Sequence, residues 1–268
     1  MNPLCRTASL SALLLSVPVL SAQVVEVHHK QEILKKARAA CYNLRSRGLL
    51  SFQSGLEPDW DTMLAGARKT NPEGTDRAVK LLEAIHFHMT LAADDSVKVT
   101  HDTVEAPNDA SAKGLAQVYG GMEQMTQGFF QTWSVFLLSY PFPEPGSPYH
   151  LVASGEQYQL TYKEGDTDEV TTTLGKDLRI LSMKVTTAAF SSLLQPQYEA
   201  TSQGLLLVGY QADYQSGNAA ETTKLQVGIQ YADVDGFKLP SELNLQGSYG
   251  GSPFSVRVAF KDIQVVHK

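Results

Sequence analysis

Short runs of alternating apolar and polar residues dominate the chain from about residue 149 onward. In one of them, Leu225, Val227 and Ile229 alternate with polar neighbours. A period of two is typical of a half-buried strand, and turn residues such as Asp235-Gly236 separate the runs. The pattern predicts antiparallel strands at 150–154, 157–162, 169–174, 178–186, 205–214, 222–231, 239–247 and 253–266, with Gln195-Pro196 as a break.

The first half of the chain mixes helical and strand patterns. Helices are predicted at 31–47, 59–67 and 76–84, and strands at 49–52, 85–91 and 97–101. Within the first helix, apolar residues recur at helical spacing and include Cys41, which predicts a buried stripe in which the thiol acts as a small hydrophobe.

Segment 111–140 carries the clearest helical pattern of the chain. At about 100° per residue its large apolar side chains share one wide face, and Lys113, Glu123 and Gln127 fall opposite. Methionine and aromatic side chains adapt to varied apolar guests, so this face is either packed core or core that also lines a ligand pocket. The candidate ligand-binding residues are Met122, Met125, Phe129, Trp133 and Phe136.

Three glycines lie seven residues apart on one edge of that apolar face. Gly114, Gly121 and Gly128 should each cost about 1 kcal/mol relative to alanine inside a helix. The principal expectation is that the helix backbone packs closely against the sheet there. The alternative is that the glycines leave space for a bound apolar ligand.

These elements predict an α+β fold. Many antiparallel strands present one apolar face, and the 111–140 helix is long enough to lie across it. We therefore expect a large curled antiparallel β-sheet, an open half-barrel, covered by the long amphipathic helix and accompanied by N-terminal helices. No composition shift divides the chain, so residues 23–268 are predicted to form a single domain.

The first 22 residues resemble a secretory signal peptide. Arg6 provides a positive start, the apolar run from Leu10 to Leu20 is about half as long as a membrane-spanning helix, and Ser21-Ala22 offers a cleavage site. The prediction is a periplasmic or secreted protein with no transmembrane segment in the mature chain. Cys41 is then the one remaining cysteine, so the core holds the fold without an internal disulfide.

The net charge of the chain bears on which partners it can attract. The formal net charge is −6, which provides no general attraction to nucleic acid. The basic residues Lys35, Lys36, Arg38, Arg45 and Arg47 are interpreted as the solvent-exposed face of the first helix. No cofactor motif is found, and the sequence carries no signal for an oligomeric state.

Three histidines form the strongest metal candidate. His86 and His88 share one face of a predicted strand, and His101 lies on the expected partner strand. The register that places Met89 and Leu91 beside Val97 and Val99 would put His101 on the opposite face. The expected register therefore separates the histidines, and no metal site is predicted.

The sequence contains no catalytic motif. Neither a G-x-S-x-G elbow nor an S-x-x-K or Cys-His arrangement is completed. The carboxylates of Asp59, Asp61, Asp94 and Asp95 fall in turn-like contexts, where aspartate usually has a structural role. The chain is therefore expected not to be an enzyme, with no catalytic residue assigned.

The order of elements resembles the periplasmic lipoprotein-carrier superfamily of Lol-type, outer-membrane lipoprotein-sorting proteins. The similarity rests on an exported chain, an N-terminal helix, a meander of strands, the strand Leu205-Leu206-Leu207-Val208 and the later run Asp235-Gly236-Phe237-Lys238-Leu239-Pro240. The resemblance implies binding of a lipid or a lipidated protein in an open half-barrel, without enzymatic activity. The 111–140 helix and the proline-rich loop after it have no matched counterpart.

Three hypotheses of different class follow. The leading hypothesis is an exported non-enzymatic carrier for a lipid, another apolar ligand or a lipidated partner. The alternative is an exported scaffold with a filled core that docks partners on its sheet, and an exported hydrolase is the third hypothesis. A hollow or filled space beneath the long helix discriminates between the first two.

Overall fold

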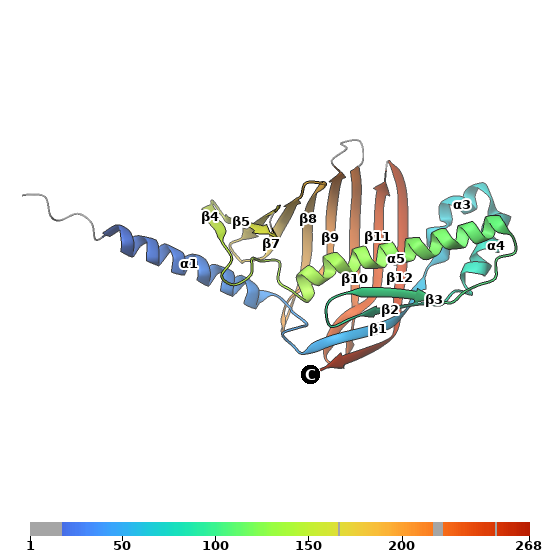
Figure 1. Cartoon of the computed structure of the whole chain (residues 1–268), viewed down its shortest axis with the longest axis horizontal. Coiled ribbons are helices and arrows are strands. Elements are labelled where there is room, and N and C mark those ends of the chain that lie inside the picture. Colours follow the sequence, from blue (N-terminus) through green and yellow to red (C-terminus); the bar gives the residue numbers. More distant parts are fainter. Residues whose placement is uncertain (1–17, 166, 217–221, 250) are drawn as a thin grey trace, which may run out of the picture.

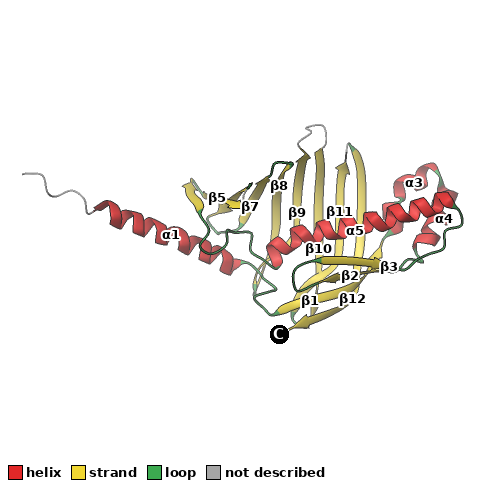
Figure 2. Ribbon diagram, in the orientation of Figure 1, coloured by secondary structure: helices red, strands yellow, loops and turns green. Residues whose placement is uncertain are grey.

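The computed structural model describes residues 18–165, 167–216, 222–249 and 251–268. About half of them form one antiparallel sheet of twelve strands in the order β3-β2-β1-β12-β11-β10-β9-β8-β7-β6-β5-β4, with the helices on one side and at the ends (Figures 1 and 2). The sheet is open, with β3 and β4 as its edges. The prediction of a large antiparallel sheet accompanied by helices is confirmed.

The strands form two groups in which consecutive strands are antiparallel neighbours. The first group is β1 (Leu49–Pro58), β2 (Phe87–Leu91) and β3 (Val97–His101). The second is a continuous meander: β4 (Tyr149–Ser154), β5 (Gln157–Glu164), β6 (Asp168–Gly175), β7 (Ile180–Thr186), β8 (Phe190–Thr201), β9 (Gly204–Ser216), β10 (Thr222–Val234), β11 (Phe237–Tyr249) and β12 (Ser252–His267). The last strand returns to pair with the first, and this joins the two groups.

Helix α5 (Asp109–Leu137) connects the two edges of the sheet and runs across it in Figure 1. Asn108 caps its start by accepting a hydrogen bond from the Ser111 amide. The prolines that follow at 141–148 prevent its continuation. At 1.5 Å per residue a helix of 29 residues is about 44 Å long, which covers most of the distance between the edges.

The remaining helices lie at the periphery. They are α1 (Pro18–Ala40), α2 (Trp60–Met63), α3 (Ala65–Thr70) and α4 (Pro72–Leu82). Figure 1 shows α1 projecting from the sheet, with only its C-terminal end against the other elements. Most of the predicted signal peptide, residues 1–22, lies outside the described residues. No helix among the described residues has the length and apolar character needed to cross a membrane.

The first helix ends earlier than the periodicity predicted. It stops at Ala40, and Cys41 forms an isolated parallel bridge with Leu205. Arg45 therefore does not lie on a solvent-exposed helix face, which corrects the sequence interpretation. Its guanidinium donates to the carbonyls of Leu49, Leu50 and Ala92 and pairs with Asp95. These tertiary partners outweigh the local helical preference.

Strand β8 was not predicted, because Gln195-Pro196 was interpreted as a break. The strand continues through Pro196, which faces Tyr210 on β9. Its pairing with β7 ends at Leu194, two residues earlier, so β8 has a free side at the proline. A proline without an N–H is tolerated where a strand has an open side.

Aromatic packing joins one side of α5 to the sheet. Phe130 lies 5.8 Å from Phe52 on β1 and 6.0 Å from Phe260 on β12, between ring centroids. The fully buried Trp133 donates from Nε1 to the Tyr231 hydroxyl at 3.1 Å, and that hydroxyl donates to the Leu207 carbonyl at 2.6 Å. This chain of hydrogen bonds fixes α5 to the middle of the sheet.

We predict that Tyr231→Phe lowers the free energy of unfolding by about 1–3 kcal/mol, because it leaves the buried Trp133 N–H without its acceptor. Urea unfolding measures the change. Tyr149→Phe, on the edge strand β4, is the control and should change the value by less than about 0.5 kcal/mol. Equal stability of Tyr231→Phe and the wild type would show that the hydrogen-bond chain does not hold the helix.

Candidate functional site

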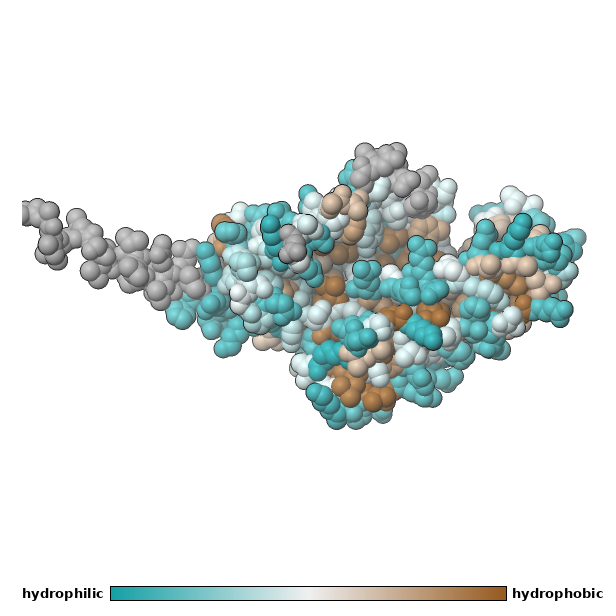
Figure 3. Space-filling view, in the orientation of Figure 1, coloured by the Kyte–Doolittle hydropathy of each residue, from teal (hydrophilic) through white to brown (hydrophobic). Residues whose placement is uncertain are grey.

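A cavity of about 900 Å³ lies along the side of α5 that faces away from β1–β3. Its walls are the helix, α2, the 139–147 segment and one face of strands β5 to β12. Figure 3 shows hydrophobic surface in the recess between α5 and the strand ends that extend beyond it. The volume is in the range of small-molecule and cofactor sites, of about 300–1,000 Å³.

One stripe of α5 forms the helical wall of this cavity. Its members recur every three or four residues, so they share one side of the helix. The stripe extends over nineteen residues of helix, or roughly 27 Å. It consists of Val118, Gly121, Met122, Gln124, Met125, Gly128, Phe129, Gln131, Thr132, Val135 and Phe136.

Four of the five predicted ligand-binding residues line the cavity: Met122, Met125, Phe129 and Phe136. Trp133 does not, because it lies about 40° around the helix from Phe129, toward the packed side. There it is fully buried and contacts Phe52 and Phe130. We therefore assign Trp133 to the packed core.

The glycine edge of α5 faces open space. A Cβ added at Gly114, Gly121 or Gly128 would meet no heavy atom within 4 Å, and the last two glycines line the cavity. The expectation that the helix backbone packs closely on the sheet at these positions is wrong. The alternative of open space beside the glycines describes the structure. Larger side chains there would project into the cavity.

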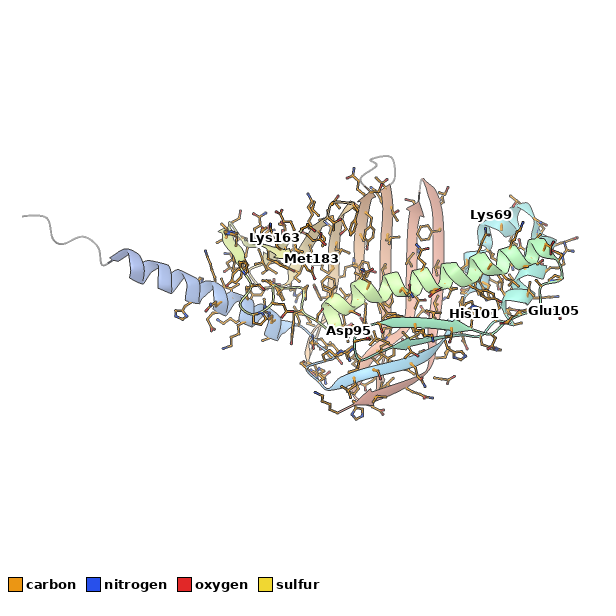
Figure 4. The ribbon with its side chains drawn as sticks, in the orientation of Figure 1. Lys69, Asp95, His101, Glu105, Lys163 and Met183 are labelled. Carbon is orange, nitrogen blue, oxygen red and sulfur yellow. The ribbon has the colours of Figure 1, made fainter. Side chains whose placement is uncertain are left out.

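Apolar side chains of the strands form most of the opposite wall. Residues on one face of a strand recur every second position, and the cavity takes its lining from that face. Figure 4 labels Met183 and Lys163 at the β5–β7 end of the cavity. The strand residues that contribute apolar surface are Tyr162, Val170, Met183, Val185, Phe190, Leu194, Tyr210, Tyr214, Leu225, Leu245, Phe254 and Val256.

Hydroxyl groups interrupt this apolar lining at one point. The side chain of Thr132 lies within reach of the hydroxyls of Tyr210 and Tyr214 on β9. Burial raises the pKa of both tyrosines, and the hydrogen bonds with Thr132 act in the opposite direction. The hydroxyls therefore stay protonated at neutral pH. Sequence reasoning missed this group, although the spacing of four along a strand places both tyrosines on one face.

The charged residues of the lining gather at one end. They are Glu144, Lys163 and Glu164, and Lys163 is the cation among the described residues that line the cavity. Arg38 lies nearby and donates to the Pro143 carbonyl, which ties α1 to the proline-rich segment. The cavity is thus apolar along most of its length and polar where β5 ends.

His88 and His101 lie on opposite faces of the β2–β3 pair. Met89 pairs with Val99 and Leu91 with Val97, so the expected register is confirmed. His101 stacks on Tyr119 of α5 with ring centroids 3.6 Å apart, whereas His86 pairs with Asp102 at 2.8 Å. Within the described residues, no group of three or more His, Cys, Asp and Glu side chains is placed to hold a metal.

The aspartates named from the sequence have structural partners. Asp59 caps α2, and its hydrogen bonds with Thr62 lower the pKa of its carboxyl group. Asp94 accepts from Ser96 in the β2–β3 turn. Asp61 pairs with Arg68, and Asp95 with Arg45. The contacts of Asp59 and Asp94 agree with the cap and turn roles expected from their positions, whereas Asp61 lies within α2 and forms an ion pair.

Comparisons of the chain with protein-family models, with curated proteins and with solved structures found no match.

We predict that Gly128→Ala raises the free energy of unfolding by about 0.5–1 kcal/mol, because the new methyl group meets open space and alanine favours the helix. Gly209→Ala is the control with the opposite expected result: it should lower the free energy of unfolding, because its Cβ would lie 2.5 Å from the Val227 carbonyl oxygen. Thermal and urea unfolding measure both variants. A destabilised Gly128→Ala would contradict the open space described here.

Cys41 should react slowly in the folded protein. Burial raises the pKa of its thiol to about 11, above the ordinary 9.0, so near pH 8 the folded chain holds about 100-fold less thiolate than the unfolded chain. Because the unfolded thiol ionises first, its contribution to stability falls as the pH rises from about 9 to 11.

A chromogenic disulfide reagent at pH 8, with and without urea, measures this difference. Cys41→Ala gives the background of the reagent. Equal rates in the folded and unfolded chains would contradict burial of the thiol.

Proposed function

We propose that this chain is an exported, non-enzymatic carrier that binds a lipid or a similar apolar ligand in the cavity beside α5. The observation that carries the proposal is a cavity of about 900 Å³ lined by apolar side chains and by two helix glycines whose Cβ positions are empty. Packed interiors seldom contain voids much larger than a water molecule. A hollow of this size therefore supports a ligand site over a scaffold with a filled core.

The geometry supports an elongated guest. The helical stripe is roughly 27 Å long, and one acyl chain extends about 15 Å, half of the hydrocarbon core of a bilayer. Burying about ten methylenes yields about 8 kcal/mol at ~0.8 kcal/mol each. That gain is of the same order as the 4–15 kcal/mol cost of association, so one well-buried chain is near the minimum for useful binding.

The asymmetry of α5 explains how a cavity persists beside a packed helix. On its filled side, Trp133, Phe130 and Phe52 hold the helix to the sheet. Asn43 fixes its C-terminal end by donating to the carbonyls of Leu138 and Ser139 at 3.0 and 2.9 Å. With one side anchored, the helix does not need to collapse onto the other wall. In our proposal, the sheet and α5 together act as an open half-barrel.

The resemblance to the periplasmic lipoprotein carriers supports the same function. It also supports export through the segment 1–22 and a periplasmic or secreted location. A lipidated protein would present the same acyl chemistry to the cavity.

The proposal predicts that protein purified gently from the exported fraction carries lipid, which native mass spectrometry detects. The double variant Gly121→Leu with Gly128→Leu should remain folded and lose at least tenfold of the bound lipid, because both side chains enter the cavity. Gly66→Leu is the matched control, since this exposed helix glycine in α3 also has no neighbour within 4 Å of a Cβ but lies outside the cavity.

Wild-type protein that repeatedly lacks lipid would overturn the proposed function. So would a folded double variant that carries as much lipid as the control. Far-ultraviolet circular dichroism and thermal unfolding establish that each variant is folded.

A further inference from the structure

Four hydroxyl-bearing side chains lie near one another in the mainly apolar cavity. Thr132 comes from α5, Tyr210 and Tyr214 from β9, and Ser192 from β8, and all four line the cavity. Ser192 pairs directly with Tyr214, so their side chains are neighbours on the same face of the sheet. We call these four residues the hydroxyl cluster.

The hydroxyl cluster has more donors than its own hydrogen bonds use. Thr132, Tyr210 and Tyr214 supply three O–H donors, and the contacts of the two tyrosines with Thr132 engage at most two of them. Ser192 is only 4% exposed, and its hydroxyl has no hydrogen-bond partner in the described part of the chain. At least two donors are therefore available to an acceptor on a ligand in the cavity.

The cluster favours a neutral acceptor over an anion. Lys163, the cation of the described lining, is on β5, four strands from β9 and so about 19 Å away across the sheet. A carboxylate at the cluster would be buried without a countercharge, which carries a large desolvation cost. A carbonyl oxygen accepts the same hydrogen bonds without that cost.

The position of the cluster matches the boundary between a chain and its headgroup. From Thr132 to Val118 the helical wall continues for fourteen residues, about 21 Å, past Phe129, Met125 and Met122. This exceeds the roughly 15 Å of one acyl chain. In the other direction Phe190, 42% exposed, marks the rim two residues along β8 from Ser192, about 7 Å away.

We propose that the cavity takes an acyl ester lipid, whose ester carbonyl accepts hydrogen bonds from the hydroxyl cluster while its chain lies along α5 toward Met122. The polar headgroup leaves at the rim beside Phe190. This inference rests on the proposed function and specifies the class of ligand. The structure thus selects an ester-linked lipid over a free fatty acid or a plain hydrocarbon.

A competition between matched lipids tests the inference. The protein is incubated in detergent micelles with equal amounts of dipalmitoyl phosphatidylglycerol and its dihexadecyl ether counterpart, which lacks the carbonyls, and native mass spectrometry gives the ratio bound. We expect the wild type to favour the ester by about threefold to tenfold, the value of one hydrogen bond. Palmitate added in equal amount should not displace the ester.

Variants that remove hydroxyl groups test whether the hydroxyl cluster causes the preference for the ester. The ester-to-ether ratio should fall to about one in Tyr210→Phe with Tyr214→Phe, and should also fall in Ser192→Ala, which tests the cluster if the tyrosine variant does not fold. Tyr158→Phe and Ser191→Ala remove hydroxyls from β5 and β8 residues that do not line the cavity, and both should keep the wild-type ratio.

The possible results are distinct. Equal binding of ester and ether by the wild type, or displacement of the ester by palmitate, would overturn this inference and leave the carrier function intact. A wild-type ratio that survives in both cluster variants would also overturn it. Binding of neither lipid would remove the proposed function itself.

Discussion

Two strands that are consecutive in the chain, β3 and β4, form the opposite edges of one open twelve-stranded sheet, and the other features follow from this connection. If flat, twelve strands would extend about 53 Å between their edges. The segment between β3 and β4 must cross that distance without unpaired backbone in the interior, and a helix satisfies its own hydrogen bonds. Helix α5, about 44 Å long, therefore has to traverse the sheet.

A single helix cannot fill the space along so wide a sheet. Side chains project from a helix in all directions, and its diameter with side chains is about 10–12 Å. The short strands β2 and β3 fold beside one flank of α5 and complete the core there, around Phe52, Phe130 and Trp133. On the other flank, the helical stripe and strands β5 to β12 line the cavity instead of packing together. The hollow is thus a consequence of topology combined with unequal packing.

The glycines and the hydroxyl cluster make that hollow a candidate site in which a bound chain would have one orientation. Gly121 and Gly128 have no side chains to fill the cavity beside α5. Met122 and Met125 supply adaptable apolar surface next to them. The Thr132–Tyr210–Tyr214 contacts place polar atoms at one level along the groove. An apolar wall alone would bind an acyl chain in any position along the cavity. Hydroxyl groups at one fixed position determine how far the chain enters.

Local patterns in the sequence determined the elements and several of their faces. Period-two alternation located most strands, the Asp235-Gly236 turn located the β10–β11 hairpin, and the apolar residues of β2 and β3 set the register that separates His88 from His101. The amphipathic pattern located α5 to within two or three residues at each end. These properties depend on neighbours in the chain or on which face is apolar, so they can be read from composition and spacing.

Only the tertiary structure decided which part of the apolar helix face is filled. Phe129 and Trp133 are equivalent in the sequence pattern, yet one lines the cavity and the other is packed between Phe52 and Phe130. The same applies beyond the end of α1, where Arg45 contacts the distant Ala92 carbonyl and Asp95. It applies also to β8, where Pro196 is tolerated beside an open strand side. Each outcome depends on residues brought together from distant segments, and that information is absent from local periodicity.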